Sequence, residues 1–436
     1  MSAPTLLQDP ALSFVPAIGD APLNPKQRRL IALAHELGET RFAPRAREWD
    51  DTATFPFANY DDLRDTGMLA LCIPESAGGL GADYATYCMV AAEIGRFCGA
   101  TALTFNMHSC STLWIGDLAD ALTMSDEQRA EHARRRALHF ARVVDGGKLY
   151  AQPFSEGSAA AAGRAPFGTT ARRAKCDETR DGVSGWVIDG RKIWASLSGA
   201  ADYCGILCTE TQEGKDGEEM QPLDMRDTLY IAVPATSEGL TISGEWNPMG
   251  MRGTVSRNLT FKSVFVPDDE QLMPRGMYFR AAQTWPHMFF TLSPTYLGIA
   301  NAAYDFTVKY LRGEVAGEPP VKRRQYPTKQ IAVAQMRIQL EAMRSMFWRT
   351  IFEAKPNPSK DERLRLYAAH YTVMEGANDI ARLALRTCGG QAMMKHLPLE
   401  RLYRDSRCGA LMLPWTAELC MDRIGREALY EAGEKD

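Results

Sequence analysis

The 436-residue sequence has no close pair of cysteines, no strong excess of charge of either sign and no long apolar run. Its ten cysteines are scattered without the CxxC spacing of zinc and redox sites. A net charge of -4 and a pI near 6.1 exclude the basic field that attracts nucleic acid or an anionic membrane surface. No stretch resembles a bilayer span, and the first residues do not resemble a secretion signal. We therefore expect a cytoplasmic protein with no metal site, nucleic-acid partner or membrane partner.

The chain does have the length and composition of a globular protein with more than one domain. Apolar residues make up 45% of it and charged residues 24%. Helical periodicity begins at Asn24, which can cap a helix whose first residue is Pro25. Short β-branched and aromatic runs replace this pattern in the middle third, and long helical patterns return afterwards. The sequence predicts an α+β fold: an N-terminal helical domain (1–146), a middle antiparallel, barrel-like β domain (147–272) and a C-terminal helical bundle (273–436).

Five segments, in order along nearly the whole chain, resemble one known family. They are GMLALCIPESAGGLGADYATYCMVAAEIGR (67–96), YAQPFSEGS (150–158), DGRKIWASLSGAADY (189–203), WNPMGMRGTVSRNLTFKSVFVP (246–267) and LALRTCGGQAMMKHLPLERLYRDSR (383–407). Together they resemble the acyl-CoA dehydrogenase superfamily of FAD-dependent flavoenzymes. The resemblance implies a helical domain, a β domain and a C-terminal four-helix bundle, assembled as a homodimer or homotetramer.

The resemblance also implies a set of residues that contact FAD. One group lies in the flavin loop of the second segment, and a second pair is the aromatic residue that packs on the flavin with the hydroxyl near its N5 atom. A glutamine also contacts FAD, and a Gly-Gly pair reaches the FAD of a partner subunit, where glycine lets the backbone approach closely. In this sequence they are Gln152, Ser155 and Ser158; Trp194 and Ser196; Gln330, Gly389 and Gly390.

The carboxylate that performs the family's chemistry is missing from both of its usual positions. Family members remove the α-proton of an acyl-CoA with this base while a hydride moves to the flavin. The base follows the arginine of the RD pair by nine residues, which is Leu413 here, or Pro414 if the alignment shifts by one. Some relatives carry it on an earlier helix, at a position that aligns with Met288. None of these side chains accepts a proton.

Three other residues are candidates for a relocated catalytic group. Glu418 follows the usual position by five residues, although an acid there also suits the first turn of the last helix. His287 neighbours the alternative position, and His108 lies in TFNMHSCS, where the N-terminal helices should meet the flavin. An imidazole can act as acid or base near neutral pH, although a lone histidine in an apolar stretch is commonly a satisfied core residue.

The sequence leaves three functions open. The first, which we take as its prediction, is α,β-desaturation of an acyl-CoA or acyl-carrier thioester in fatty acid metabolism, with an electron-transfer flavoprotein as acceptor. The second is a flavin-dependent monooxygenase of the same fold, which receives reduced flavin from a flavin reductase and uses dioxygen. The absent glutamate and the histidines favour this alternative. The third is a binding protein without activity, against which the retained Trp194, Ser196 and Gly389 segment argue.

Overall fold

The computed structural model describes residues 23–157, 160, 165–179, 182–211, 224–431 and 434. The first part is helical, and α1 begins as predicted, because the Asn24 side chain accepts from Gln27 N and Pro25 occupies the first turn. The helices of this part are α1 (Pro25–Leu37), α2 (Ala43–Thr52), α3 (Phe57–Asp65), α4 (Tyr84–Phe97), α5 (Gly99–Ile115), α6 (Asp117–Asp120) and α7 (Asp126–Val144).

A single sheet follows, in the order β6-β7-β3-β2-β4-β5-β8, with β1 paired to β4. Its strands are β1 (Tyr150–Ala151), β2 (Thr170–Arg173), β3 (Gly185–Ala195), β4 (Tyr203–Glu210), β5 (Thr228–Pro234), β6 (Leu240–Ser243), β7 (Arg257–Pro267) and β8 (Gln271–Met273). The pairs are antiparallel as predicted, except that β4 runs parallel to β1 and to β2. This departure arises because the chain leaves β3 and returns on the other side of β2.

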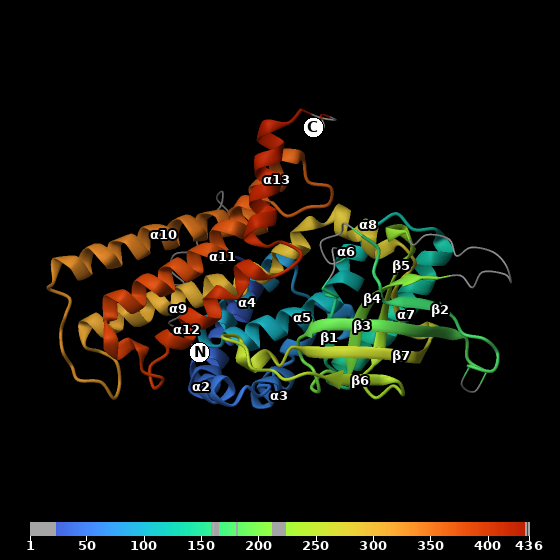
Figure 1. Ribbon diagram of the computed structural model, residues 1–436, viewed down its shortest axis with the longest axis horizontal. Helices are drawn as coiled ribbons and strands as arrows, with labels where there is room; N and C mark the ends of the chain where they lie inside the picture. The colour runs from blue at the N-terminus through green and yellow to red at the C-terminus, as the bar shows by residue number, and fades with distance from the viewer. Residues whose placement is uncertain are drawn as a thin grey trace.

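The last part is helical again, with α8 (Met277–Thr284), α9 (Ser293–Arg312), α10 (Pro327–Phe352), α11 (Lys360–Cys388), α12 (Leu399–Arg407) and α13 (Ala417–Leu429). The long helices α9, α10 and α11 lie side by side at one end of the molecule and the sheet lies at the other, while α13 stands out from the body (Figure 1). The predicted α+β fold, with its order of helices, strands and helices, is confirmed. None of the helices in the described ranges is long and apolar enough to cross a membrane.

The N-terminal and C-terminal helices are joined tightly where α4 crosses α9. A Cβ atom on Gly95 would lie 2.6 Å from the Thr295 carbonyl oxygen, and one on Gly298 would lie 2.3 Å from the Ala92 carbonyl oxygen. Glycine at both positions therefore permits the close approach of the two helices. This contact fixes the 3₁₀ segment η9 (Pro286–Leu292), which precedes α9, next to α5. The space between α5, η9 and the sheet is where the candidate site lies.

Candidate active site

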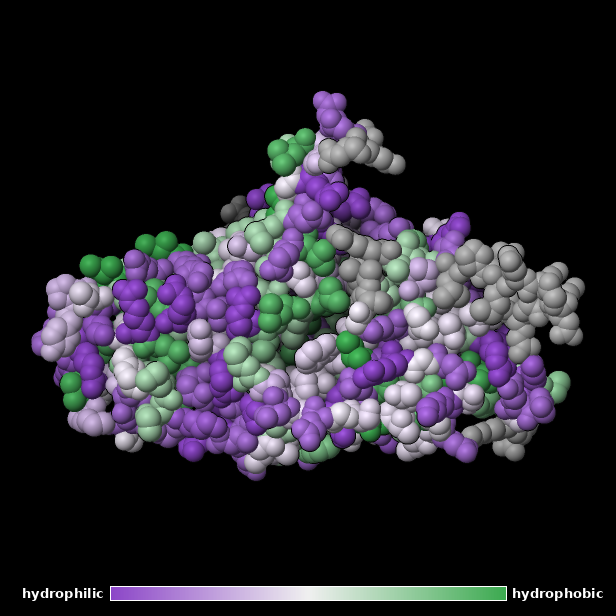
Figure 2. Space-filling view, viewed as in Figure 1, coloured by the Kyte–Doolittle hydropathy of each residue, from purple (hydrophilic) through white to green (hydrophobic). Residues whose placement is uncertain are grey.

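A cavity of about 840 Å³ lies between the sheet, α5, α8, η9 and the segment that joins α12 to α13. Its volume is in the range of cofactor and substrate pockets. Figure 2 shows apolar side chains gathered around a hollow on this face, near the foot of α13. Ten of the lining residues are aromatic: Trp114, Phe154, Phe167, Trp194, Trp246, Tyr278, Phe279, Phe289, Tyr367 and Trp415.

Trp194 is the most exposed of the large aromatic residues in this wall. Trp194 is 63% exposed although it lines a cavity. Its ring and that of Trp246 form a T-shaped pair with their centres 5.9 Å apart. Its φ of 55° is left-handed, as are those of Leu197 (64°), Met251 (54°) and Val255 (45°). These unfavourable conformations are held by the bonds from Leu197 N to Thr254 O and from Ser198 N to Val255 O. The backbone is therefore strained where the Trp194 indole faces the cavity.

A row of three hydroxyl groups lies beside this indole. Thr254 Oγ1 donates to Met251 O at 2.8 Å, Ser256 Oγ lies 2.9 Å from Thr254 Oγ1, and Ser196 Oγ lies 2.8 Å from Ser256 Oγ. Since each hydroxyl has one proton, the row is satisfied when Ser196 donates to Ser256 and Ser256 donates to Thr254. The Ser196 oxygen is then left as an acceptor for a ligand N–H group.

The predicted flavin loop borders the same cavity. Gln152 and Ser155 line it, and Gln152 Nε2 donates to Tyr230 Oη at 2.9 Å. Ser158 lies outside the described residues, and Gly157, which precedes it, lines the cavity. Trp194 and Ser196, which were also predicted to contact the flavin, line the same cavity. Together, Gln152, Ser155, Gly157, Trp194 and Ser196 suit a flat group with polar edges, such as an isoalloxazine.

The loop is fastened to the sheet by a buried ion pair. Lys192 Nζ lies 2.6 Å from Glu156 Oε1 and also donates to Leu207 O at 2.5 Å. Glu156 accepts two further bonds, from Gly168 N and Thr169 N. Burial alone would raise the pKa of the Glu156 carboxyl group, but Lys192 and Thr169 hold this pKa below its usual value. Burial lowers the pKa of the Lys192 ammonium group, and Glu156 opposes this shift. The pair anchors the turn that faces the cavity.

The remaining three predicted FAD contacts do not line the cavity. Gln330 is exposed on α10 and donates to Arg324 O at 3.0 Å. Gly389 and Gly390 follow the end of α11, where added Cβ atoms would meet nothing within 4 Å. They thus lie on an open surface that a partner subunit can approach, and their contact with FAD stays a prediction.

The positions of the missing base lie in the cavity wall. Leu413, Pro414 and Met288 all line it, together with Trp415. Among the described lining residues there is no aspartate, glutamate, histidine or lysine. Two thiols are present, but burial raises the pKa of Cys110 and that of Cys408 to about 12 each. The part of the lining that the structure describes therefore offers no carboxylate, imidazole or thiolate to remove a proton at neutral pH.

The three relocated candidates do not reach this space. Glu418 is exposed in the first turn of α13, the position that favours an acid for reasons of helix electrostatics. His108 is fully engaged, since Nε2 lies 2.9 Å from Leu69 O and Nδ1 accepts from Tyr150 N at 3.1 Å. Its neighbours Pro286 and Met288 line the cavity, but His287 itself does not. Burial lowers the pKa of both histidines to about 4, so both are neutral core residues at physiological pH.

A buried histidine supports the aromatic wall instead. His370 Nε2 donates to Trp415 O at 3.0 Å, and its Nδ1 lies 2.9 Å from Ser293 Oγ. This arrangement requires the Nε2-protonated tautomer, with Ser293 donating to Nδ1. Burial lowers the pKa of His370 to about 4, which keeps it neutral. It joins α11, α9 and the Leu413–Trp415 segment at the place where relatives carry their base.

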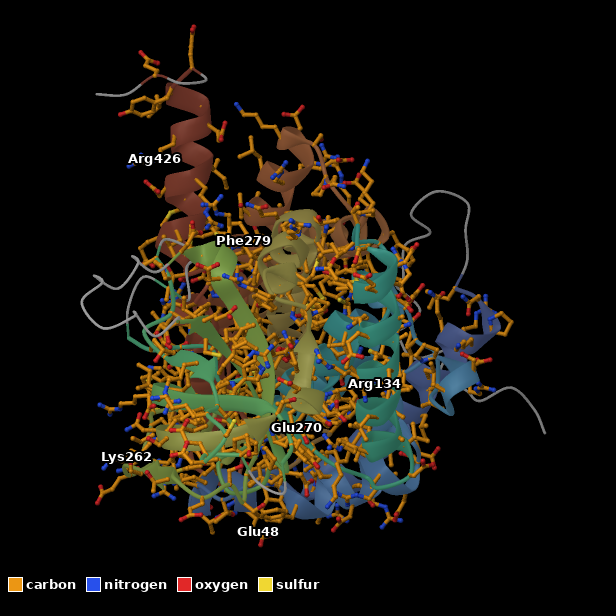
Figure 3. All side chains as sticks on the ribbon, turned by 90° about the vertical axis from the view of Figure 1, so that its right-hand side faces the viewer. Glu48, Arg134, Lys262, Glu270, Phe279 and Arg426 are labelled. Atoms are coloured by element: carbon orange, nitrogen blue, oxygen red, sulfur yellow. The ribbon has the colours of Figure 1, made fainter. Side chains whose placement is uncertain are left out.

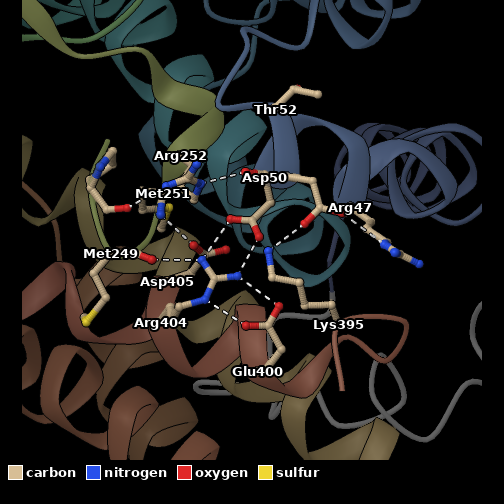
Figure 4. Close-up of polar contacts among 12 residues, drawn as sticks. Arg47, Asp50, Thr52, Met249, Met251, Arg252, Lys395, Glu400, Arg404 and Asp405 are labelled. Carbon is tan, nitrogen blue, oxygen red and sulfur yellow. Dashed lines mark hydrogen bonds and ion pairs between the residues drawn. The ribbon is translucent and has the colours of Figure 1, made fainter. Parts of the chain in front are cut away.

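A polar network under the cavity fixes the turn at Met249–Arg252 (Figure 4). Arg404 of α12 bonds both carboxylate oxygens of Asp50 and both of Glu400. Its neighbour Asp405 is 4% exposed and accepts from Met251 N at 2.5 Å. Arg252 in turn donates to Asp50 O, so its role is structural in the described chain. The network ties α2, α12 and the left-handed turn into one unit.

The buried Asp405 makes the stability of the protein depend on pH. Burial raises its pKa to about 6, so as pH rises from 4 to 6 the unfolded chain loses this proton before the folded one. The free energy of unfolding then falls over this window, and Asp405→Asn, which still accepts from Met251 N, is expected to be more stable than wild type at pH 7 by on the order of 3 kcal/mol. Urea unfolding at pH 4 and pH 7 checks this. Equal stability differences at the two pH values would contradict it.

Comparison with known proteins gives three family matches in chain order. The models of the acyl-CoA dehydrogenase N-terminal, middle and C-terminal domains match residues 24–132, 163–264 and 281–429. The mitochondrial short-chain specific acyl-CoA dehydrogenase of Homo sapiens is 27% identical over 383 residues, 87% of this chain and 84% of that protein. The L-evernosamine nitrososynthase of a Micromonospora species is 28% identical over 435 residues, 94% of this chain and 92% of that protein.

Solved structures share the fold as well. The dibenzothiophene monooxygenase of Paenibacillus sp. A11-2 superposes with a TM-score of 0.73 at 21% identity, covering 92% of this chain and 97% of that one. The same protein has also been crystallised with FMN. The similarity thus includes proteins named for dehydrogenation and proteins named for oxygenation.

Proposed function

The chain belongs to the acyl-CoA dehydrogenase family, and from this membership we propose that it is a flavin-dependent monooxygenase that uses reduced flavin and dioxygen. The observation that carries the proposal is the cavity wall at Leu413, Pro414 and Met288, which offers no proton acceptor in place of the family's glutamate. Oxygen transfer does not require an α-proton to be removed. Flavin-dependent oxygen transfer is therefore favoured over desaturation of an acyl thioester.

The chain's own residues would hold and orient the cofactor. Trp194 offers a flat apolar surface, and Ser196 offers an acceptor beside it. Asn106 also lines the cavity, where its Nδ2 is occupied by Tyr87 Oη (2.7 Å) and Thr291 O (3.0 Å). Its Oδ1 remains to accept from a ligand. When bound, the flavin supplies the electron pair that reduces one atom of dioxygen to water, while the substrate receives the other atom.

Acyl thioester desaturation remains the second candidate. It is favoured by the 27% identity to the human short-chain enzyme over most of both chains. It would require a group outside the described lining to move into the cavity and act as base, with an electron-transfer flavoprotein as acceptor. The identity to the L-evernosamine nitrososynthase is 28% over 94% of this chain, so sequence identity does not favour thioester desaturation.

We propose FAD as the flavin, on the strength of the open Gly389–Gly390 surface and its match to the family's partner contact. FMN is the alternative, since the similar monooxygenase binds it. Chromatography of the flavin released from the purified protein distinguishes the two. A separate flavin reductase is the proposed partner for oxygen transfer.

We also propose a homo-oligomer and a cytoplasmic location. Large apolar side chains are exposed on α10 and just after α11, namely Ile331 (60%), Ile338 (71%) and Met393 (66%). Ile331 and Ile338 are seven residues apart and share one face of α10, and exposed apolar faces of helices are found at interfaces. The ten cysteines are all free, which suits a reducing compartment. Light scattering on the purified protein measures the assembly.

The proposal is tested by following labelled oxygen. The protein, its flavin, a flavin reductase and isotopically labelled dioxygen are incubated with organic amines, thioethers and indole, and the products are weighed by mass spectrometry. We expect one labelled oxygen atom in a product, dependent on the protein. Protein-dependent consumption of an acyl-CoA with no labelled product from any compound would refute it.

A further inference from the structure

Two arginines line the cavity without a carboxylate partner. Arg363 donates from Nε to Pro358 O at 3.2 Å, and no other hydrogen bond ties its guanidinium group to the described residues. Arg423 lies with its guanidinium carbon 4.8 Å from the Tyr367 ring centre and 6.0 Å from that of Trp415. Among the described residues that line the cavity, these two arginines are the ones with a charged side chain, and no aspartate, glutamate or lysine accompanies them.

The acidic residues around them are already engaged by other cations. Asp422 bonds Arg426 at 2.9 Å, Glu427 bonds Lys360 at 2.5 Å and Glu362 bonds Lys355 at 2.7 Å. Helical spacing alone would pair Arg423 with Glu427, four residues later, yet that carboxylate turns to α11. The two arginines therefore keep their charge available to the cavity.

Both arginines are related in space to Tyr367. Arg363 and Tyr367 are four residues apart on α11, so they lie on the same face of that helix. Arg423 reaches the same ring from α13. A guanidinium group held on an aromatic ring loses part of its freedom in advance and keeps its N–H groups for bidentate bonds to an oxyanion.

We propose that Arg363, Arg423 and Tyr367 form an anion-binding site on the solvent side of the cavity, which holds a carboxylate or phosphate group of the substrate. The site rests on the proposed function, because it orients a substrate whose other end is to be oxygenated. Beyond this site the cavity wall is aromatic. The ring centres of Trp415 and Phe289 are 5.5 Å apart, and those of Phe289 and Trp114 are 6.2 Å apart. The substrate class is thus an organic anion with a flat, apolar reactive end.

The site is tested by binding alone, on the oxidised flavoprotein, with two matched pairs of probes. Indole-3-acetate is compared with indole-3-acetamide, and thymidine diphosphate with thymidine, by calorimetric titration. We expect wild type to bind the anion of at least one pair about tenfold more tightly than its neutral partner. The pair that shows the preference identifies carboxylate or phosphate as the group bound.

Substitutions assign the preference to these residues. Arg423→Gln and Arg363→Gln are each expected to lower the ratio of anion to neutral affinity at least threefold, with flavin content unchanged. The matched control is Arg426→Gln, on the same helix, because Arg426 projects to the outside and is paired with Asp422 (Figure 3). It is expected to keep the wild-type ratio.

Two outcomes overturn the site: wild type without anion preference in either pair, or a preference that both cavity variants retain. Because no oxygen transfer is measured, a protein that shows the arginine-dependent preference but never incorporates labelled oxygen would keep the site and lose the proposed function. A protein that oxygenates neutral substrates without any anion preference would keep the function and lose the site.

Discussion

Lys192→Met is expected to lower the free energy of unfolding by about 3–5 kcal/mol, because it leaves the buried Glu156 carboxylate without its cation. Lys192 is fully buried and Glu156 nearly so, with the charged atoms 2.6 Å apart. The carboxylate would retain its bonds from Gly168 N and Thr169 N, which do not neutralise it. Urea unfolding followed by circular dichroism measures the loss.

The double variant Lys192→Met/Glu156→Gln separates charge from packing. Removing both charges should restore more than half of the lost stability, since an uncharged buried pair has no unpaired ion. Lys262→Met on β7 is the surface control, because Lys262 is exposed on the neighbouring strand (Figure 3). A single variant that unfolds at the wild-type urea concentration would mean that the ion pair does not hold the flavin loop.

Trp194→Ala is expected to weaken flavin binding by about tenfold to a hundredfold, the loss of one aromatic stacking surface of roughly 1.4–2.8 kcal/mol. The substitution does not relieve the left-handed backbone, because alanine meets the same steric restriction as tryptophan at φ 55°. The expected effect therefore comes from the missing ring. Titration of the flavin-free protein with FAD and with FMN, followed by flavin fluorescence, gives the affinities.

Trp194→Phe is the matched variant, since it keeps a smaller aromatic ring on the same backbone. Its flavin affinity should fall between those of wild type and Trp194→Ala. Equal affinity in all three proteins would mean that the flavin is held elsewhere, and the assignment of the cavity would be wrong.

The order of helices and strands could be predicted from local sequence patterns, such as helical periodicity and helix caps. The periodicity of Tyr84–Phe97 matched α4 at both ends, and the Asn24–Pro25 cap marked the start of α1. These features are set by residues close in the chain. The parallel pairing of β4 was not predicted, because an apolar run such as YCGILCTE, buried on both faces, is found in parallel strands and in buried antiparallel strands alike.

The site was only partly visible for a related reason. Trp194 and Ser196 stand in a recognisable segment, whereas Arg363 and Arg423 line one cavity only because α13 packs across α11. In the sequence each is one arginine among many on helices with charged faces. The sequence could not decide the role of the histidines, because an imidazole in an apolar stretch has the same sequence pattern whether its nitrogens bind a ligand or, as for His108, the backbone.

The most direct test of the central claim is to mix the oxidised flavoprotein with acyl-CoA thioesters of increasing chain length in the absence of oxygen and to follow the visible absorbance of the flavin. A cavity without a proton acceptor at Leu413, Pro414 or Met288 predicts that the flavin stays oxidised with every thioester. Rapid bleaching by any of them would contradict the account, because it would require a base that the described residues of the cavity wall do not supply.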